Sequence, residues 1–325
     1  MRKLNFSILC AGSIAAKMAE TVSKMDEVAP YAIAARDLNR AQNLADEFGF
    51  PKAYGSYDEL VNDENVDFIY IASPHSHHYQ HAKLCLEHGK NVLCEKSFTV
   101  NLKQAQELFD LAKRKNLFIM EAVWTRFQPF ATKLSEIIDS GMIGKPLTIT
   151  ASIGQDMRHV ERIVNPELAG GALLDLGIYP LTFASMVFGT EVVKIVSTCV
   201  KSDRGVDAQD SVTLVYKSGQ MAVLNFSFLS TMKNQAIIYG DKGYISLQTY
   251  WHPEEIQVYL NGEAEPKTHK VPFDFSGYEY EVRAAAKAMD QGELSCEQML
   301  PEETLRILKI MDQLRADWGI LYPFE

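Results

Sequence analysis

The sequence predicts an α/β protein of two domains: a first domain built on a parallel sheet, and an α+β domain with a large, mostly antiparallel, open sheet. The chain has 325 residues, more than one hydrophobic core usually serves. As far as Val123, short apolar runs alternate with amphipathic stretches, and beyond it strand-like runs are separated by tight turns. We therefore expect a first domain over residues 1–123 and a second over residues 124–325.

In the first domain, apolar runs indicate strands, and the stretches between them repeat apolar residues every three or four positions, as helices do. The predicted strands are Leu4–Cys10, Tyr31–Ala35, Phe68–Ala72, Asn91–Cys94 and Phe118–Val123. The predicted helices are Arg40–Phe48, Tyr79–His88 and Leu102–Lys115. Strands that alternate with helices pair in parallel through helical crossovers.

The second domain carries runs in which apolar and polar residues alternate, which is typical of an antiparallel sheet with one covered face. The predicted strands are Val192–Lys201, Ser211–Tyr216, Met221–Phe228, Gln235–Tyr239 and Ile256–Leu260. The predicted covering helices are Tyr179–Phe188, Tyr278–Gln291 and Glu302–Trp318. We expect the open face of this sheet to form a homodimer, and we allow for the last helix to pack back on the first domain.

Charge and cysteine content exclude several classes of partner. The 32 basic and 42 acidic residues give a net charge of −10, and no window is rich in Lys and Arg, so we expect no nucleic acid or anionic membrane partner. Five scattered cysteines without a C-x-x-C pair indicate a reduced, cytoplasmic protein. We find no run of about 18 apolar residues, the length that a membrane-spanning helix needs.

The first turn has the spacing of a dinucleotide-binding fingerprint. G-x-G-x-x-G/A, placed between a strand and a helix, lets the backbone approach a pyrophosphate in a Rossmann domain. Here Cys10 stands at the first glycine, Gly12 at the second and Ala15 at the third, with Ser13 and Ile14 between them. We expect these residues to bind a dinucleotide, although a plain strand-to-helix turn has similar sequences.

The end of the second predicted strand indicates which cofactor binds. NAD-specific domains place an acidic residue there for the ribose 2′-hydroxyl, whereas this chain has Arg36. A guanidinium suits a 2′-phosphate, so we expect NADP, with NAD possible. In the alternative interpretation Arg36 is an exposed charge and Asp37 caps a helix. Arg40 suits either arrangement.

The end of the next predicted strand also belongs to this expected cofactor site. It reads Ser73-Pro74-His75-Ser76-His77-His78, at the carboxyl edge where ligands bind in parallel sheets. No carboxylate or cysteine accompanies the histidines, and Pro74 suits a helix start, so we expect no metal. We assign Ser73, Pro74, His75 and His78 to the cofactor site and leave His77 to solvent.

Three further segments carry a family resemblance. They are Cys94-Glu95-Lys96-Ser97, Glu121-Ala122-Val123-Trp124-Thr125-Arg126-Phe127 and Gly170-Gly171-Ala172-Leu173-Leu174-Asp175-Leu176-Gly177-Ile178-Tyr179. In these segments the chain resembles the Gfo/Idh/MocA family of NAD(P)-dependent oxidoreductases over essentially its whole length. It is most similar to the branch that contains the dimeric dihydrodiol dehydrogenases.

The resemblance implies that Lys96 is the catalytic lysine, that Asp175 and Tyr179 complete the site, and that NADP is the usual cofactor. Spacing agrees, since residues four apart lie on one face of a helix. The chain departs from the family twice, with Cys10 for the first glycine and Ser97 for the proline of Glu-Lys-Pro.

Other residues are candidates with structural alternatives. Glu95 and Arg126 are assigned to the cofactor side, and Trp124, Arg158 and Trp251 to the substrate pocket. Core packing is the rival role for Trp124, and a surface salt bridge is the rival role for Arg126. Arg158 and its neighbour Arg162 could both reach the cleft, with a solvated loop charge as their rival role.

Together these residues predict an NADP-dependent oxidoreductase. It would transfer hydride between a nicotinamide and a carbinol or carbonyl of a small cyclic diol or sugar-like substrate. The alternatives are an NAD-dependent pyranose dehydrogenase and a non-catalytic regulator that senses NADPH.

Overall fold

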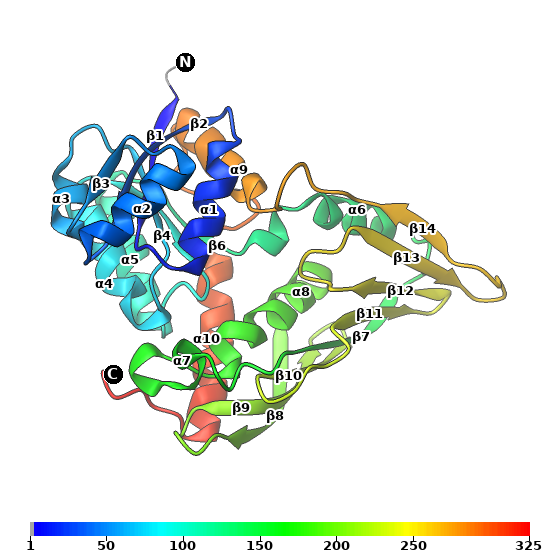
Figure 1. Cartoon of the computed structure of the whole chain (residues 1–325). Coiled ribbons are helices and arrows are strands. Elements are labelled where there is room, and N and C mark those ends of the chain that lie inside the picture. Colours follow the sequence, from blue (N-terminus) through cyan, green and yellow to red (C-terminus); the bar gives the residue numbers. More distant parts are fainter. Residues whose placement is uncertain (1–2) are drawn as a thin grey trace. The chain divides into compact units, whose positions relative to one another are not determined.

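The computed structural model describes residues 3–325, which form two compact units (Figure 1). Unit 1 is the chain up to Phe127 together with Asp274–Leu308, and unit 2 is Gln128–Phe273 together with Lys309–Glu325. The first crossing between units lies close to the expected boundary after residue 123. Residues 274–308 differ from that expectation because they belong with unit 1.

The sheet of unit 1 has six parallel strands in the order β3-β2-β1-β4-β5-β6. They are β1 (Leu4–Leu9), β2 (Val28–Ala34), β3 (Lys52–Tyr54), β4 (Phe68–Ile71), β5 (Asn91–Glu95) and β6 (Ile119–Ala122). This strand order is that of dinucleotide-binding domains, in which ligands bind outside the carboxyl ends of the strands. The predicted parallel sheet is confirmed, and each predicted strand lies within a few residues of an observed one.

Helices from both segments of unit 1 cover this sheet. They are α1 (Ser13–Ser23), α2 (Leu38–Phe48), α3 (Tyr57–Asn62), α4 (His75–Glu87), α5 (Leu102–Lys115), a 3₁₀ helix (Trp124–Arg126), α9 (Glu279–Asp290) and the first part of α10 (Pro301–Trp318). Val282 and Ala285 of α9 are fully buried in one core with Phe6 of β1 and Met18 of α1. Burial of these apolar side chains explains why α9 belongs with unit 1.

Strand β3 was not predicted, because it has only three residues and no apolar run. Side-chain hydrogen bonds to Asp63, which follows α3, hold it in place. The Asp63 carboxylate accepts bonds from Lys52 Nζ at 2.7 Å and Tyr54 Oη at 2.6 Å, both on β3, and from Tyr31 Oη of β2 at 2.8 Å. Partial burial raises the pKa of Asp63. The hydrogen bonds have the larger effect and hold this pKa well below its usual value.

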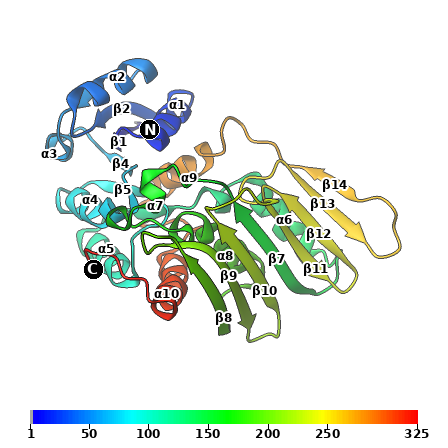
Figure 2. The same ribbon diagram turned by 60° about the horizontal axis from the view of Figure 1, so that its bottom comes forward.

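The sheet of unit 2 has eight strands in the order β14-β13-β12-β11-β7-β10-β9-β8 (Figure 2). They are β7 (Pro146–Gly154), β8 (Val192–Lys201), β9 (Asp207–Tyr216), β10 (Met221–Ser227), β11 (Gln235–Gly240), β12 (Gly243–Gln248), β13 (Glu255–Leu260) and β14 (Lys267–Lys270). All neighbours are antiparallel except β7 and β10. The large, mostly antiparallel sheet is therefore confirmed.

One face of this sheet is covered. Along β7, Ile149, Ala151 and Ile153 are buried, whereas Thr148 and Thr150 on the other face are partly exposed. The helices of unit 2 are α6 (Pro129–Asp139), α7 (Glu161–Val164), a 3₁₀ helix (Pro166–Leu168), a π-helical turn (Leu173–Gly177), α8 (Ile178–Phe188) and the last part of α10. In both views α8 and α6 lie against the same face (Figures 1 and 2).

The helical stretch Pro166–Phe188 differs from the expectation that no segment resembles a membrane-spanning helix. By length and composition it is apolar enough to cross a membrane. Its residues are mostly buried inside the molecule, as those of a core helix are.

The Asp63 network yields a stability prediction. We expect Asp63→Asn to lower the free energy of unfolding at pH 7 by about 1–2 kcal/mol, because hydrogen bonds to a charged group are worth about 1.5–3 kcal/mol before solvent screening. The folded pKa is lowered, so the carboxylate's contribution is complete above the unfolded pKa of about 4 and is lost as the pH falls below it.

Urea unfolding of both proteins between about pH 7 and pH 3 measures this difference. The matched control is Glu64→Gln, which removes an exposed carboxylate next to Asp63 and should change stability by less than about 0.5 kcal/mol. A difference that stays constant with pH would contradict the assigned role of the charge.

Candidate active site

The turn between β1 and α1 has the geometry of a pyrophosphate-binding turn, although its first residue is a cysteine. Cys10 has a φ of +92°, a conformation that glycine adopts freely and other residues rarely do. Its N–H donates to the carbonyl of Ala34 on β2 at 2.9 Å. The fingerprint's first position is thus occupied by Cys10 without loss of the turn, at the cost of backbone strain.

Gly12 leaves room for a ligand over this turn. A Cβ built there meets no protein atom within 4 Å, so the space beside the backbone is open. Ser13 and Ile14 begin α1, where backbone N–H groups lack partners within the helix and favour an anion. Ala15 is fully buried in the core, which fits the close helix packing expected at the third position. These residues fit a dinucleotide pyrophosphate.

At the end of β2, the two charged candidates have different roles. Asp37 caps α2, and its carboxylate accepts the N–H of Asn39 at 2.9 Å. Arg40 donates from Nη2 to the carbonyl of Ala11 at 2.7 Å and so braces the pyrophosphate turn. Arg36 is exposed and makes no hydrogen bond or ion pair with any of residues 3–325. Arg36 is therefore the cation at this edge that an anionic ligand can use.

Sequence reasoning missed Tyr57 and His81, which belong to the same edge. Their rings meet edge to face with centroids 4.7 Å apart. Burial raises the pKa of Tyr57 to about 12, with a further contribution from the nearby Cys10, while the charges of Arg36 and Arg40 oppose the rise. The signal that finds Tyr57 is the capping box of Ser56 and Glu59, which marks the start of α3.

The histidines after β4 brace the fold around Lys96. His78 is fully buried, with Nδ1 2.8 Å from the carbonyl oxygen of Ser97 and Nε2 2.7 Å from that of Ser73. Burial lowers its pKa to about 4, so it is neutral at pH 7 and donates its one N–H to one of these oxygens. His75, after the N-cap Pro74, packs edge to face on His78 at 5.6 Å.

His81 and His77 complete this group. His81 Nδ1 lies 2.9 Å from the Ser73 hydroxyl, and burial lowers the pKa of His81 to about 4. His77 is half-buried rather than fully solvated, and burial, with the charge of Arg36 as a second cause, lowers its pKa. Among the described residues, no three metal-binding side chains come together.

Lys96 follows β5 directly and is half-buried. Its peptide bond to Ser97 is cis. On its N-terminal side, the carboxylate of Glu95 is buried, accepts the N–H of Lys96 at 3.2 Å and is hydrogen-bonded by the hydroxyl of Tyr70 on β4. The backbone that presents Lys96 is therefore held by buried side chains.

On the C-terminal side, Glu121 of β6 performs a similar role. One of its oxygens accepts the N–H of Phe98 at 2.9 Å, and the other accepts the hydroxyl of Thr304 on α10 at 2.8 Å. Burial raises the pKa of Glu121 to about 7, which these hydrogen bonds partly offset. Sequence reasoning cited Glu121 only as part of a family motif.

The residues after β6 make contacts inside unit 1. Trp124 stacks on Tyr278, with ring centroids 4.3 Å apart and an angle of 11° between the planes. Arg126 forms an ion pair with Glu303 of α10 through Nη2 and donates from Nη1 to the carbonyl of Gln298 at 3.4 Å. The stacking of Trp124 matches the packing role considered for it. The ion pair of Arg126 is largely buried, with side chains 15% and 11% exposed, and so differs from the surface salt bridge that was considered.

In unit 2, a glycine pair precedes the helix that carries Asp175 and Tyr179. A Cβ at Gly170 would lie 2.4 Å from the carbonyl oxygen of Ile163, and one at Gly171, whose φ is +124°, would lie 2.2 Å from Asp207 Oδ1. Asp207 also accepts the N–H of Leu173. Close approach of the chain therefore requires both glycines, and Asp207 fixes where the helix begins.

Asp175 is buried in the π-helical turn, and half-buried Tyr179 follows in α8. A π turn has a wider spacing than the regular helix that was expected, and such turns occur frequently at functional sites. Asp175 Oδ1 accepts a bond from Arg162 Nη1 at 2.7 Å. Arg162, which was considered either as a residue that reaches the cleft or as a solvated loop charge, is therefore a partner of a candidate catalytic residue.

The other pocket candidates of unit 2 differ in their surroundings. The rings of Trp251 and Tyr179 lie 5.9 Å apart, so the structure brings these two candidates together. Arg158 instead pairs with Asp156, at 2.9 Å from Nε and 2.6 Å from Nη2, and is 64% exposed. This contact is the solvated loop pair that was considered for Arg158.

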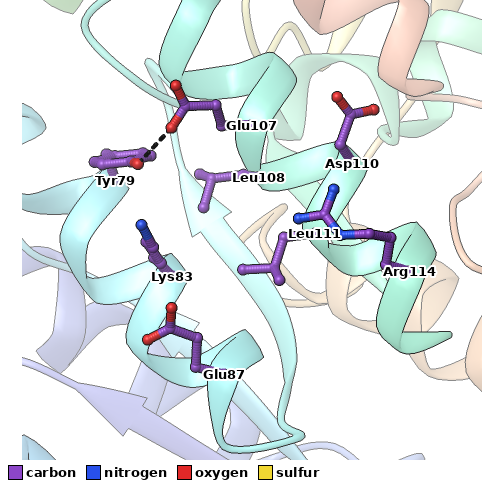
Figure 3. A pocket seen from close by; sticks show the side chains of 8 residues that line it. All are labelled: Tyr79, Lys83, Glu87, Glu107, Leu108, Asp110, Leu111 and Arg114. Carbon is purple, nitrogen blue, oxygen red and sulfur yellow. Dashed lines mark hydrogen bonds between the residues drawn. The ribbon is translucent and has the colours of Figure 1, made fainter.

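A groove of about 320 Å³ between α4 and α5 contains none of these candidates (Figure 3). Tyr79 donates to Glu107 at 2.6 Å at one end of it, and Lys83, Glu87, Asp110 and Arg114 extend along the two helices (Figure 3). Its acidic and basic side chains are interspersed, so it presents no single charge to a ligand. The candidate residues lie instead at the carboxyl edge of the parallel sheet and around α8.

Comparisons with known proteins agree with this arrangement. Residues 4–123 match the oxidoreductase family with an NAD-binding Rossmann fold, and residues 131–246 match the GFO/IDH/MocA C-terminal domain. The chain is 36% identical over 329 residues to the trans-1,2-dihydrobenzene-1,2-diol dehydrogenase of Xenopus tropicalis. The aligned region covers 98% of this chain and 99% of the relative. It is also 36% identical to the Mus musculus enzyme of the same name, and that aligned region covers 98% of each of the two chains.

Solved structures share the fold. KijD10, a 3-ketoreductase from Actinomadura kijaniata solved with NADP and TDP-benzene, has a TM-score of 0.88 at 24% identity, over 97% of this chain and 98% of the other. Aldose-aldose oxidoreductase from Caulobacter crescentus, solved with glycerol, has a TM-score of 0.89 at 19% identity, over 98% of each chain. With its two matched domains and its relatives above 30% identity, this chain belongs to the Gfo/Idh/MocA family of NAD(P)-dependent oxidoreductases, as its sequence motifs predict.

Proposed function

We propose that this protein uses NADP to oxidise a carbinol, or to reduce the matching carbonyl, of a cyclic diol or sugar-like substrate. One observation carries the choice of NADP: Arg36 stands exposed and without a partner in the described chain, at the strand end that faces the adenosine ribose in Rossmann domains. Asp37, the nearest acid, is engaged as a helix cap. The names of the relatives, which act on a dihydrobenzene diol, support the substrate class.

The cofactor would lie along the carboxyl edge of the unit 1 sheet. The turn from Cys10 to Ala15 would hold the pyrophosphate, with Gly12 open to it. Ser73, Pro74 and His75 at the end of β4 and Glu95 at the end of β5 would line the edge toward the nicotinamide. When bound, NADP accepts or delivers the hydride.

The substrate oxygen needs a proton partner, because an alcohol loses its proton as its carbon becomes a carbonyl. We assign proton transfer to the Tyr179 phenol, with the Lys96 ammonium favouring the phenolate. Asp175, held by Arg162, would orient a substrate hydroxyl. The assignment requires Lys96 and the pair Asp175 and Tyr179 to reach the same substrate, with Trp251 and Trp124 as walls of the pocket.

We further propose that the protein is a cytoplasmic homodimer. Its five cysteines are free, which suits a reducing compartment. A row of paired residues across the open face of the unit 2 sheet carries no charge: Val196, Thr213, Val223, Thr150 and Ile237. Mixed apolar and small polar residues without charges are typical of the core of a subunit interface.

Arg36→Ala tests the cofactor assignment. We expect the affinity for NADPH to fall about 10- to 100-fold, since charge-assisted bonds to a phosphate contribute about 1.5–3 kcal/mol, and the affinity for NADH to change less than about threefold. Fluorescence titrations of both nucleotides measure this. Arg114→Ala, an arginine of the groove in Figure 3, is the control. A wild-type preference for NAD that Arg36→Ala leaves unchanged would refute the proposal.

Lys96→Met tests the chemistry. Without the Lys96 ammonium to favour the Tyr179 phenolate, we expect kcat to fall about 10²- to 10⁴-fold, the usual contribution of acid–base catalysis, while the Kd for NADPH changes by much less. The assay uses a panel of cyclic diols, sugars and dicarbonyls with NADP and NADPH. Lys103→Met, an exposed lysine on α5, serves as the control. Full activity of Lys96→Met would remove Lys96 from the mechanism.

Val223→Lys tests the dimer. A lysine at this central position of the open face would bury an unpaired charge between two copies, so we expect a monomer in analytical ultracentrifugation where the wild type is a dimer. Leu321→Lys, at a 76% exposed site that does not belong to this row of open-face residues, should remain dimeric. A dimer that tolerates Val223→Lys, or a monomeric wild type, would show that this face is not the interface.

A further inference from the structure

Glu281, in the first turn of α9, is a buried acid without a donor. Its side chain is 0% exposed, and neither of its oxygens has a hydrogen-bond partner among residues 3–325. Glu279, two residues earlier, is equally buried but accepts the N–H groups of Phe275 at 2.9 Å, Ser276 at 3.0 Å and Gly277 at 2.7 Å. Glu279 therefore has the donors that an ionised carboxylate needs in the interior, and Glu281 has none.

The groups that interact with Glu281 are acids and a phenol, all in unit 1. The charges of Glu95 on β5 and of Glu279 both act on Glu281. The hydroxyl of Tyr70 on β4 donates a hydrogen bond to Glu95. Burial, and then the charges of Glu95 and Glu281 and a contribution from Tyr278, raise the pKa of Tyr70. Among the described residues, no cation contributes to the pKa shift of Glu281. An ionised Glu281 would be a second negative charge in the interior, facing Glu95.

Burial, reinforced by the charges of Glu95 and Glu279, raises the pKa of Glu281 well above its usual value. A buried carboxyl group in such surroundings takes up a proton and becomes neutral rather than remain charged without a partner. A protonated carboxyl also gains an O–H, which can donate to an acceptor. We assign Glu95 as the acceptor, because a carboxylate oxygen can accept more than one hydrogen bond, whereas Oε2 of Glu279 already accepts three.

We propose that Glu281 is a neutral carboxylic acid at pH 7 and acts as a positioning residue that puts no further negative charge beside Glu95, the carboxylate that accepts the N–H of Lys96. Its O–H would donate to Glu95, alongside the hydroxyl of Tyr70. Glu95 would then keep its other oxygen on the N–H of Lys96, where the structure has it. The neutral state of Glu281 follows from its surroundings alone, whereas the link to catalysis rests on the proposed function of Lys96.

The protonation state can be tested without activity. Glu281→Gln replaces a neutral acid by a neutral amide of the same shape. In the infrared difference spectrum of the wild type minus Glu281→Gln at pH 7, we expect the carbonyl band of a protonated carboxylic acid. The subtraction removes bands of other buried acids such as Glu121 and Asp210. Absence of the band would overturn the proposal.

Stability against pH gives a second test. The folded pKa of Glu281 is raised, so the native state binds this proton more tightly than the unfolded state, and wild-type stability falls as the pH rises above the unfolded pKa of about 4.3. Glu281→Gln binds no such proton. We expect its Tm to exceed that of the wild type by an amount that grows between about pH 5 and pH 8, the working range above that unfolded pKa.

Asp290→Asn is the matched control, because it neutralises an exposed acid at the other end of α9. Its Tm difference from the wild type should not vary with pH. A Tm difference for Glu281→Gln that is equally independent of pH would mean that Glu281 is ionised in the folded protein, which contradicts the proposal.

The link to Lys96 is tested by comparing two substitutions. Glu281→Gln keeps a neutral donor beside Glu95, whereas Glu281→Leu removes it and keeps the volume. We expect Glu281→Leu to lower kcat about tenfold, roughly the effect of one hydrogen bond to a charged group, and to shift the pH profile of kcat/KM, with an unchanged Kd for NADPH. Glu281→Gln should retain the wild-type profile.

The outcomes separate the two levels of the proposal. Loss of activity in Glu281→Leu with an unshifted profile would mean that Glu281 only supports packing and would overturn its positioning role. Failure of the proposed function would appear differently, as a wild type without turnover on any substrate of the panel. The infrared band and the pH-dependent Tm difference would then still decide whether Glu281 is neutral.

Discussion

Fixation of the backbone around Lys96 is the constraint on which the site in unit 1 depends. The carbonyl of Ser97 and the N–H of Phe98 are buried, and buried backbone groups need partners. No regular strand supplies them, since β5 ends at Glu95. Glu121 of β6 accepts the N–H of Phe98, and a ring nitrogen of His78 from α4 lies 2.8 Å from the carbonyl oxygen of Ser97. Elements on both sides of β5 thus determine where Lys96 is presented, and α10 joins them through Thr304 and Glu121.

Elements with a strong pattern could be predicted from the sequence, and elements held by side chains could not. The runs at Leu4, Asn91 and Val192 predicted β1, β5 and β8 because their apolar or alternating residues reflect burial within a sheet. Strand β3 depends on hydrogen bonds to Asp63, which lies beyond the next helix, and the residues of β3 themselves carry no pattern that predicts a strand. Strand β7 was missed although it alternates, because it precedes the region where the tight turns made the pattern recognisable.

The candidate site shows the same division. Gly12 and Arg36 could be named as candidates because motif spacing and strand ends carry information along the chain, and Asp175 and Tyr179 because the chain resembles a known family. The contact of Arg162 with Asp175 could not be predicted, because it crosses a glycine turn whose path only the fold defines. Contacts also changed the meaning of residues that were found: Arg126 is engaged with Glu303, and His78 braces the backbone next to Lys96. In both cases the residue type was informative and its partner was not predictable.

Several buried acids lie close to the candidate catalytic residues without being candidates themselves. Their surroundings give each of them a different role. Glu121 has two donors and holds the segment after Lys96, and burial raises its pKa to about 7. Asp207, whose pKa burial raises to about 6, accepts the N–H of Leu173 and fixes the turn that leads to Asp175. Glu281 has no donor among residues 3–325. Because an acid with donors can remain charged and one without them cannot, donor supply determines which of these groups brace the backbone as acceptors. The same rule predicts that Glu281 keeps its proton, so that its O–H can donate a hydrogen bond to Glu95.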